Sequence, residues 1–185
     1  MKQDFFERAA GTNAIRISAR DPVLDDIKIA ACLFMFIDHL YKIETGLWTD
    51  CYPLALGRIA WPLFVYVFAT LFSAKPSAFG NTVRRAAVLL LFGVGTQPVF
   101  EAYFDTWRLN IMFTFALSVI FTYSFELLTL AFRGEKGPLT AALGMSGIAF
   151  SILVSFFVEY GVVGVVTTGG ATVMFRKFND SRKGV

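Results

Sequence analysis

The sequence predicts an all-α membrane protein, a bundle of about six transmembrane helices with both termini in the cytoplasm. Three observations lead to this prediction. Apolar residues make up 56% of the chain and charged residues only 17%, whereas soluble domains have about 25% charged residues. Six apolar segments follow one another, most of them close to the ~20 residues that a helix needs to cross a bilayer. Basic residues gather in alternate connectors.

Each apolar segment predicts one helix. The segments are residues 27–43, 54–74, 83–104, 111–132, 139–157 and 162–178. The first is near the lower length limit, and the last is interrupted by two threonines and two glycines at 167–170. Small residues inside a membrane helix favour the close approach of a neighbouring helix. Residues 27–178 are therefore predicted to form one transmembrane domain.

Both ends of the chain are more polar. In residues 1–26, Phe5 and Phe6 lie among charged residues, which predicts an amphipathic helix at the cytoplasmic membrane surface. Asp21 precedes Pro22 and should end that helix, because the residue before a proline avoids helical geometry. We expect no cleavable signal peptide, since a polar stretch precedes the first apolar segment. Residues 179–185 are predicted to be a cytoplasmic tail.

The distribution of basic residues predicts the orientation. If the N-terminus is cytoplasmic, most of the 17 Lys and Arg residues lie on the cytoplasmic side. The opposite side holds Lys42, Arg58 and Arg108. Basic residues favour the cytoplasmic side of a membrane, so both termini should be there.

With this orientation, polar residues from every predicted helix meet in the outer, periplasmic half of the bundle. They are Asp38, His39, Arg58, Gln97, Glu101, Asn110, Glu159 and Tyr160. Ionisable residues in or near a membrane core are destabilising and usually face a partner or a wet cavity. The sequence therefore predicts a polar pocket in this half.

His39 is the one histidine of the chain and the candidate general base, because the pKa of histidine lies near the working pH. Asp38 and His39 are adjacent, so on a helix they should point about 100 degrees apart. We therefore expect Asp38 to pair with Arg58 of the next helix and not to orient the ring of His39. The alternative is a polar network that only holds helices together, with Arg58 extended to the outer interface.

The remaining polar residues are candidates for binding. Glu101 and Asn110 flank a short outer loop, and Glu159 and Tyr160 form the turn between the last two helices. Glu159 has the alternative of being a solvated turn residue. We expect no metal, because a single His and two Cys without CxxC spacing supply no ligand set. We also expect no nucleic-acid partner.

Four motifs, in the right order, resemble those of the TraX family. IKIAACLFMFIDHLYKI at 27–43 resembles the first helix of that family, and GRIAWPLFVYVFA at 57–69 resembles the second. LNIMFTFAL at 109–117 is similar to the central motif, and EYGVVGVV at 159–166 is similar to the Tyr-Gly signature. Trp61 stands where a Phe is common in the family, which changes the size of the pocket.

The resemblance implies a multi-pass protein of the bacterial inner membrane that acetylates the amino terminus of the mature conjugative pilus subunit. The implied donor is acetyl-CoA, and the implied partners are pilin and membrane lipids. The resemblance carries over His39, Asp38, Arg58 and Asn110, with less weight on Glu159 and Tyr160. Glu101 is inferred from its depth alone. His39 would take the proton of the pilin amine, and Arg58 or Asn110 would stabilise the oxyanion.

Acetyl-CoA is cytoplasmic, whereas processed pilin has its amino terminus on the periplasmic side. We therefore expect a cavity through the bundle that lets the pantetheine arm reach the outer pocket. Arg84 and Arg85 are candidate partners of the CoA phosphates. The alternative is that they only follow the general preference of basic residues for the cytoplasmic side of the membrane. Rival functions are acyl transfer to a sugar or lipid hydroxyl, and a non-catalytic role in pilin maturation or assembly.

Overall fold

The computed structural model describes residues 21–45, 52–73, 79–104 and 107–183. Six helices account for nearly all of these residues: α2 (Pro22–Thr45), α3 (Tyr52–Ser73), α4 (Phe79–Phe104), α5 (Ile111–Phe132), α6 (Pro138–Ser155) and α7 (Gly161–Lys183). Each helix coincides with one predicted apolar segment, so the all-α prediction is confirmed. The last helix runs further than predicted, into the proposed tail. Most of the predicted N-terminal amphipathic helix lies outside the described residues.

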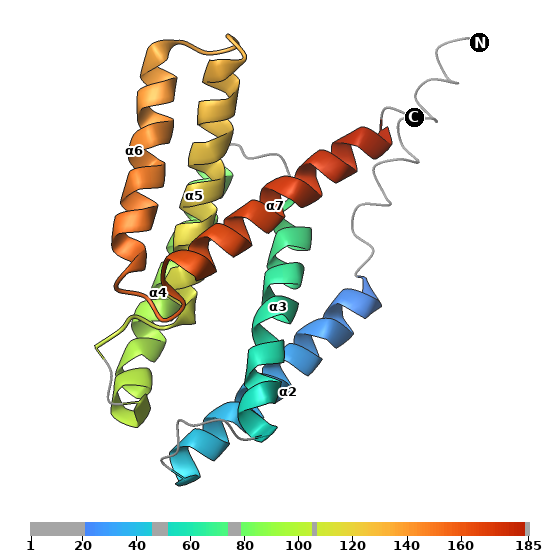
Figure 1. Ribbon diagram of the computed structural model, residues 1–185, viewed down its shortest axis with the longest axis vertical. Helices are drawn as coiled ribbons and strands as arrows, with labels where there is room; N and C mark the ends of the chain where they lie inside the picture. Colours follow the sequence, from blue (N-terminus) through green and yellow to red (C-terminus); the bar gives the residue numbers. More distant parts are fainter. Residues whose placement is uncertain (1–20, 46–51, 74–78, 105–106, 184–185) are drawn as a thin grey trace, which may run out of the picture.

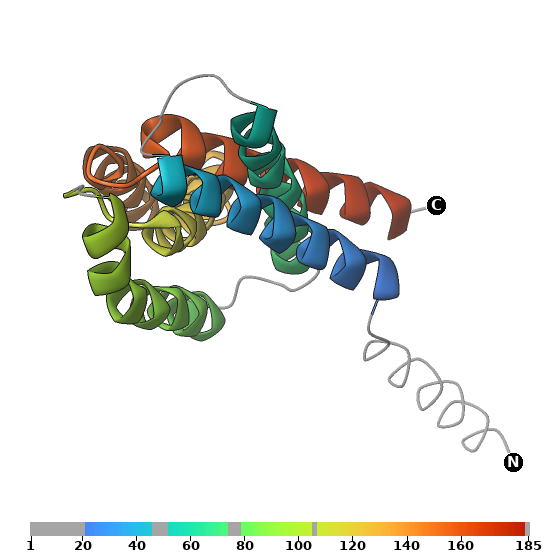
Figure 2. The ribbon, with the colours of Figure 1, turned by 90° about the horizontal axis from the view of Figure 1, so that it is seen from below.

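The helices form two groups that α7 joins (Figure 1). α2 packs on α3 in one group, and α5 packs on both α4 and α6 in the other. α7 crosses the bundle obliquely and packs on both α3 and α5. Figure 2 shows the bundle from below, with the ends of α2 and α4 nearest the viewer. We call this the outer end, and we call the end with the α5–α6 loop the inner end.

Three helical segments are long and apolar enough to cross a membrane: Phe79–Tyr103, Ile111–Phe132 and Pro138–Ser155. The apolar part of α3, Ile59–Ser73, is shorter. Large apolar side chains such as Leu91 and Leu153 are exposed, as expected where lipid is the solvent. The fold is therefore consistent with a membrane protein. That all six helices cross the bilayer, with both termini inside, stays a prediction.

Aromatic rings fill the space between α3 and α5. Trp61 stacks on Phe115, with ring centroids 5.7 Å apart, and Phe68 stacks on the same Phe115 at 5.1 Å. Phe68 in turn stacks on Phe72 at 4.0 Å. Stacked aromatic pairs stabilise beyond the area that they bury. We call these four residues the aromatic column; it runs from the middle of α3 to the inner end of that helix.

Close packing of α5 on α6 depends on Gly144. A Cβ at Gly144 would lie 2.8 Å from the carbonyl oxygen of Ser124 and 2.9 Å from the backbone nitrogen of Leu128. Both are backbone atoms of α5, so they cannot move away without moving the helix. This contact is the small-residue packing typical of membrane helices.

We therefore expect Gly144→Ala to destabilise the protein by about 1–3 kcal/mol, the usual range for an overpacked interior. Thermal unfolding in detergent measures the effect. Gly80→Ala in α4 is the matched control, because nothing lies within 4 Å of a Cβ at Gly80. Equal melting temperatures for the two variants would contradict the close contact.

Candidate functional site

The turn between α6 and α7 is set back inside the bundle. In Figure 1 it lies well above the lower ends of α2 and α4. The backbone N–H of Leu109 donates to the carbonyl oxygen of Phe157 at 2.8 Å. The backbone N–H of Glu159 donates to the carbonyl oxygen of Leu109 at 2.9 Å. These two bonds tie the turn to the segment before α5. They place Glu159 and Asn110 close together, far apart though they are in the sequence.

Asp38 is engaged by its own helix. Lys42 Nζ lies 2.6 Å from Asp38 Oδ2, a pair one helical turn apart, and Asp38 is only 5% exposed. His39 Nδ1 lies 3.4 Å from the same oxygen. The expectation that adjacency keeps Asp38 from the His39 ring was therefore wrong, because side-chain torsions bring the two ends together although their Cβ atoms diverge. The side chain of Arg58 lies outside the described residues, so its pairing with Asp38 stays a prediction.

Lys42 is a site residue that our reading of the sequence did not select. Its positive charge acts on Glu159 as well as on His39. The signal was present in the sequence, since an acid followed four residues later by a lysine is a common helical ion pair. The ion pair holds one oxygen of Asp38 between a lysine and a histidine.

Glu159 is half-buried and therefore is not a fully solvated turn residue. Burial raises the pKa of Glu159 to about 7, and the negative charge of Asp38 acts in the same direction. The positive charge of Lys42 and the backbone N–H of Ile111 oppose this shift. The carboxyl group thus changes its charge close to neutral pH, as a group that exchanges protons in catalysis should.

The raised pKa predicts a pH dependence of stability. The folded protein binds the Glu159 proton more tightly than the unfolded chain, so stability should fall as the pH rises from about 4.5 through about 7. Glu159→Gln stays neutral and should lose this fall, which makes it more stable than wild type at pH 8 by roughly 1–3 kcal/mol. Melting temperatures at several pH values test this, with Glu135→Gln as an exposed control. Parallel pH curves for wild type and Glu159→Gln would contradict the assignment.

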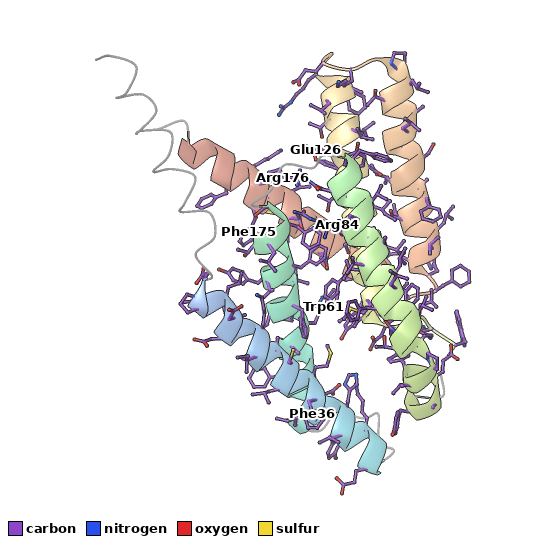
Figure 3. The ribbon with its side chains drawn as sticks, turned by 180° about the vertical axis from the view of Figure 1, so that it is seen from behind. Phe36, Trp61, Arg84, Glu126, Phe175 and Arg176 are labelled. Atoms are coloured by element: carbon purple, nitrogen blue, oxygen red, sulfur yellow. The ribbon has the colours of Figure 1, made fainter. Side chains whose placement is uncertain are left out.

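Tyr160 stacks on Trp61, the first ring of the aromatic column, with ring centroids 3.9 Å apart and planes at 13°. Burial, together with the nearby charges of Glu159 and Asp38, raises the pKa of Tyr160. The phenol therefore stays protonated and can donate a hydrogen bond. The stack joins the α6–α7 turn to the middle of α3, where Figure 3 labels Trp61.

Asn110 is buried and committed to the protein. Its side-chain oxygen accepts from the backbone N–H of Met112 at 3.0 Å and so caps α5. Its Nδ2 donates to the carbonyl oxygen of Gly93 at 3.0 Å and to Thr96 Oγ1 at 3.1 Å. Because both amide hydrogens are used within the protein, this geometry favours a role in holding α5 against α4 over direct contact with an oxyanion.

Glu101 belongs to the same polar cluster, through Gln97. Gln97 Nε2 donates to Glu101 Oε1 at 3.0 Å, and Gln97 Oε1 accepts from the backbone N–H of Asn110 at 3.0 Å. Glu101 is exposed and does not line the cavity described next, although its neighbours Phe100 and Tyr103 do. The structure therefore brings Glu101 to Asn110 through Gln97, and among the described contacts none joins Glu101 to His39 or Glu159.

A cavity of about 520 Å³ opens between α2, α4 and α5 at the outer end. Its walls are mostly apolar and include Phe36, Leu40, Val99 and Tyr103, and its polar edge holds His39, Thr96 and Asn110. Figure 3 labels Phe36 on α2. A space of this size can hold a small molecule or a few residues of a peptide.

A second cavity, of about 510 Å³, lies at the inner end, beside the start of α4. Arg84, Arg85 and Asn81 line it, and the Arg85 guanidinium lies 4.7 Å from the centroid of the Phe72 ring. Two guanidinium groups and the amide of Asn81 on one wall suit an anion. Figure 3 shows Arg84 between α4 and α7.

These two cavities are separate, which differs from the continuous passage that we expected. The hydrophobic cluster around Phe115 packs against Ile111, which lines the outer cavity, and against Phe72 and Leu89, which line the inner one. Large aromatic side chains thus fill the region between them. Within the described ranges, no group of three or more His, Cys, Asp or Glu is placed to hold a metal ion.

Comparison with known proteins gives one match. The chain matches the family described as TraX protein over residues 23–182. No curated protein and no solved structure matches the chain. The matched range contains nearly all of the six helices and all the residues of the two cavities. Membership of this family suggests a role in the maturation of conjugative pilin. The chain belongs to the TraX family.

Proposed function

We propose that this protein is a membrane-embedded acetyltransferase of the bacterial inner membrane. It transfers the acetyl group of acetyl-CoA to the amino terminus of the mature conjugative pilus subunit. The observation that carries the proposal is the cluster of Asp38, His39 and Lys42 on α2, with His39 beside the outer cavity. The charges of Asp38 and Lys42 also act on Glu159 of the α6–α7 turn. An amine needs a nearby base before it can attack a thioester, and this group of residues supplies two candidates.

His39 is the proposed base. It lines the outer cavity, and Asp38 beside Nδ1 favours the tautomer that leaves Nε2 to accept the proton. Glu159 is the proposed partner of the pilin ammonium group, since its carboxylate form is present above about pH 7. Arg58 at the start of α3 is the proposed donor to the oxyanion.

Acetyl-CoA would bind at the inner cavity, with Arg84 and Arg85 on its phosphates. The acetyl group must then pass the aromatic column. From Trp61 to Phe72 the helix rises by about 16 Å, so the pantetheine arm has to displace rings along this length. We therefore propose that donor binding moves α3 or its aromatic side chains.

The test is intact-mass analysis of the mature pilin, expressed with or without this protein. We expect a mass gain of one acetyl group, located at the amino terminus, only when the protein is present. An unmodified pilin together with a newly acylated polysaccharide or lipid would favour the hydroxyl-acceptor alternative. Pilin that fails to accumulate without the protein, but is never acetylated, would favour a non-catalytic maturation or assembly factor.

Arg84→Gln with Arg85→Gln should weaken acetyl-CoA binding. A charge-assisted hydrogen bond contributes about 1.5–3 kcal/mol, so we expect KM for acetyl-CoA to rise roughly ten- to a hundredfold with little change in kcat. Initial rates in nanodiscs at varied acetyl-CoA measure this. Lys136→Gln, an exposed loop residue at the same end, is the control. If the double variant kept the wild-type KM, these arginines would not bind acetyl-CoA and would serve only to orient the protein in the membrane.

A further inference from the structure

Two rows of small residues face each other between α5 and α7. On each helix the row takes every fourth residue. The row on α5 is Thr114, Ser118 and Thr122, and the row on α7 is Gly164, Thr168 and Thr172. All six residues are buried. We call the five side chains that carry a hydroxyl group the hydroxyl row.

Contacts at both ends show that the two rows face each other. At the outer end, a Cβ at Gly164 would overlap Tyr160 Cβ and lie 3.0 Å from Thr114 Cγ2. At the inner end, Arg176 Nη1 lies 2.6 Å from Glu126 Oε2; both residues are labelled in Figure 3. Glu126 and Arg176 each follow their row by four residues. Rows at this spacing are inclined to the helix axis, which agrees with the oblique crossing of α5 and α7 in Figure 1.

The hydroxyl row therefore connects two polar places. Its outer end lies beneath Tyr160, the residue next to Glu159. Its inner end opens into a cavity of about 170 Å³ lined by Thr122, Glu126, Arg176 and other residues, several of them charged.

Two of the hydroxyl groups lack a partner. Ser118, Thr122 and Thr172 each donate to the carbonyl oxygen one turn earlier on their own helix, at 2.7–2.8 Å. Thr114 Oγ1 and Thr168 Oγ1 are fully buried and have no hydrogen-bond partner among the described residues. A buried hydroxyl without a partner is destabilising, and valine would fill the same space without this penalty. Packing alone therefore does not explain two threonines at these places, whereas bound water does.

We propose that the hydroxyl row binds water and carries protons between the outer site and the inner cavity. Hydroxyl groups and water both donate and accept hydrogen bonds, which a chain of proton transfers requires. None of the cavities described above is lined by Thr114 or Thr168, so the row leaves no room for the pantetheine arm.

The need for such a path rests on the proposed acetyl transfer. The pilin ammonium group carries three protons. Its nitrogen attacks the thioester carbonyl carbon, and the carbon–sulfur bond breaks. One proton stays on the amide nitrogen, one ends on the thiol of CoA, and one must leave for bulk water. The outer cavity has mostly apolar walls, and the hydroxyl row offers this proton a polar path to the inner end.

The first experiment asks whether water reaches the row, and it needs no enzyme activity. The native cysteines are first removed by Cys32→Ser and Cys51→Ser. Single cysteines are then introduced by Thr114→Cys or Thr168→Cys. Each variant is exposed to Ag⁺ in nanodiscs, and after denaturation a maleimide labels the thiols that Ag⁺ has not reached. Ala116→Cys and Val165→Cys, at fully buried apolar positions of the same two helices, are the controls. We expect Ag⁺ to abolish labelling at 114 and 168 and to spare the controls. Equal protection of all four cysteines overturns the proposal.

The second experiment asks whether the row moves protons. Thr114→Val with Thr168→Val keeps the shape of both side chains, so we expect unchanged or higher thermal stability together with a several-fold slower pilin acetylation. Ser151→Ala, which removes a buried hydroxyl on α6, should keep the wild-type rate. A double variant that acetylates at the wild-type rate overturns the proton path. If wild type acetylates no pilin, the proposed function fails, and Ag⁺ accessibility still decides whether the row holds water.

Discussion

His39→Ala is expected to stop pilin acetylation while the protein still folds and inserts. Removing a general base typically slows a reaction about 10²–10⁴-fold, which in a cell leaves pilin essentially unmodified. The effect should fall on kcat, because His39 accepts a proton only as the amine attacks. Its ring adjoins both the outer cavity and Asp38. Initial rates in nanodiscs and the intact mass of pilin measure the loss.

Glu44→Gln is the matched control for this substitution. It changes another polar residue of α2, but Glu44 is exposed and contributes nothing to the proposed site. We expect its rate to stay within about twofold of wild type, the range of surface substitutions. Full acetylation by inserted His39→Ala would remove the histidine from the mechanism and leave Glu159 as the candidate base.

Arg176→Gln should produce the largest loss of stability among the charge substitutions. Arg176 Nη1 lies 2.6 Å from Glu126 Oε2 and links α7 to α5. Breaking a fully buried pair by removing one partner is destabilising by about 3–5 kcal/mol. The Arg176 and Glu126 side chains are 20% and 34% exposed, so we expect about 1–3 kcal/mol here after allowing for solvent screening.

The loss comes mainly from the carboxylate that is left without its cation. Glu126→Gln together with Arg176→Gln should therefore be more stable than Arg176→Gln alone. Unfolding midpoints of wild type, the two single variants and the double variant form a cycle that isolates the pairwise term. A zero coupling would show that the two side chains act independently and that the α5–α7 packing does not depend on their contact.

Helix positions were predictable from the sequence because lipid imposes a simple rule. A spanning helix needs about 20 apolar residues, and connectors need polar ones, so α5 was predicted at its observed bounds, Ile111–Phe132. The convergence of polar residues from different helices was predicted only from how deep each residue lies in the membrane. His39, Asp38 and Glu159 were therefore selected before any contact was known, and electrostatic interactions between Asp38 and Glu159 agree with that selection.

Partners within the site depended on helix rotation and on the lengths of the side chains. Depth cannot tell whether Asp38 faces the next helix or its own, and in the structure it lies 2.6 Å from Lys42. Depth in the membrane also cannot tell whether a side-chain amide binds substrate or only holds helices together. Asn110 has the position of a substrate ligand, yet its hydrogen bonds fix α5 to α4.

The sequence by itself determined the all-α class of this protein, the positions of the six helices in the described residues and the family to which it belongs. These properties follow from composition, from the spacing of apolar segments and from short motifs, all of which are local along the chain. The tertiary structure decided that the α6–α7 turn is bonded to the segment before α5, where Glu159 is half-buried. It also decided that aromatic rings separate the two large cavities and that two rows of small residues meet between α5 and α7. These features depend on how helices distant in the sequence are rotated and set against one another, because burial and hydrogen bonding are properties of the packed bundle.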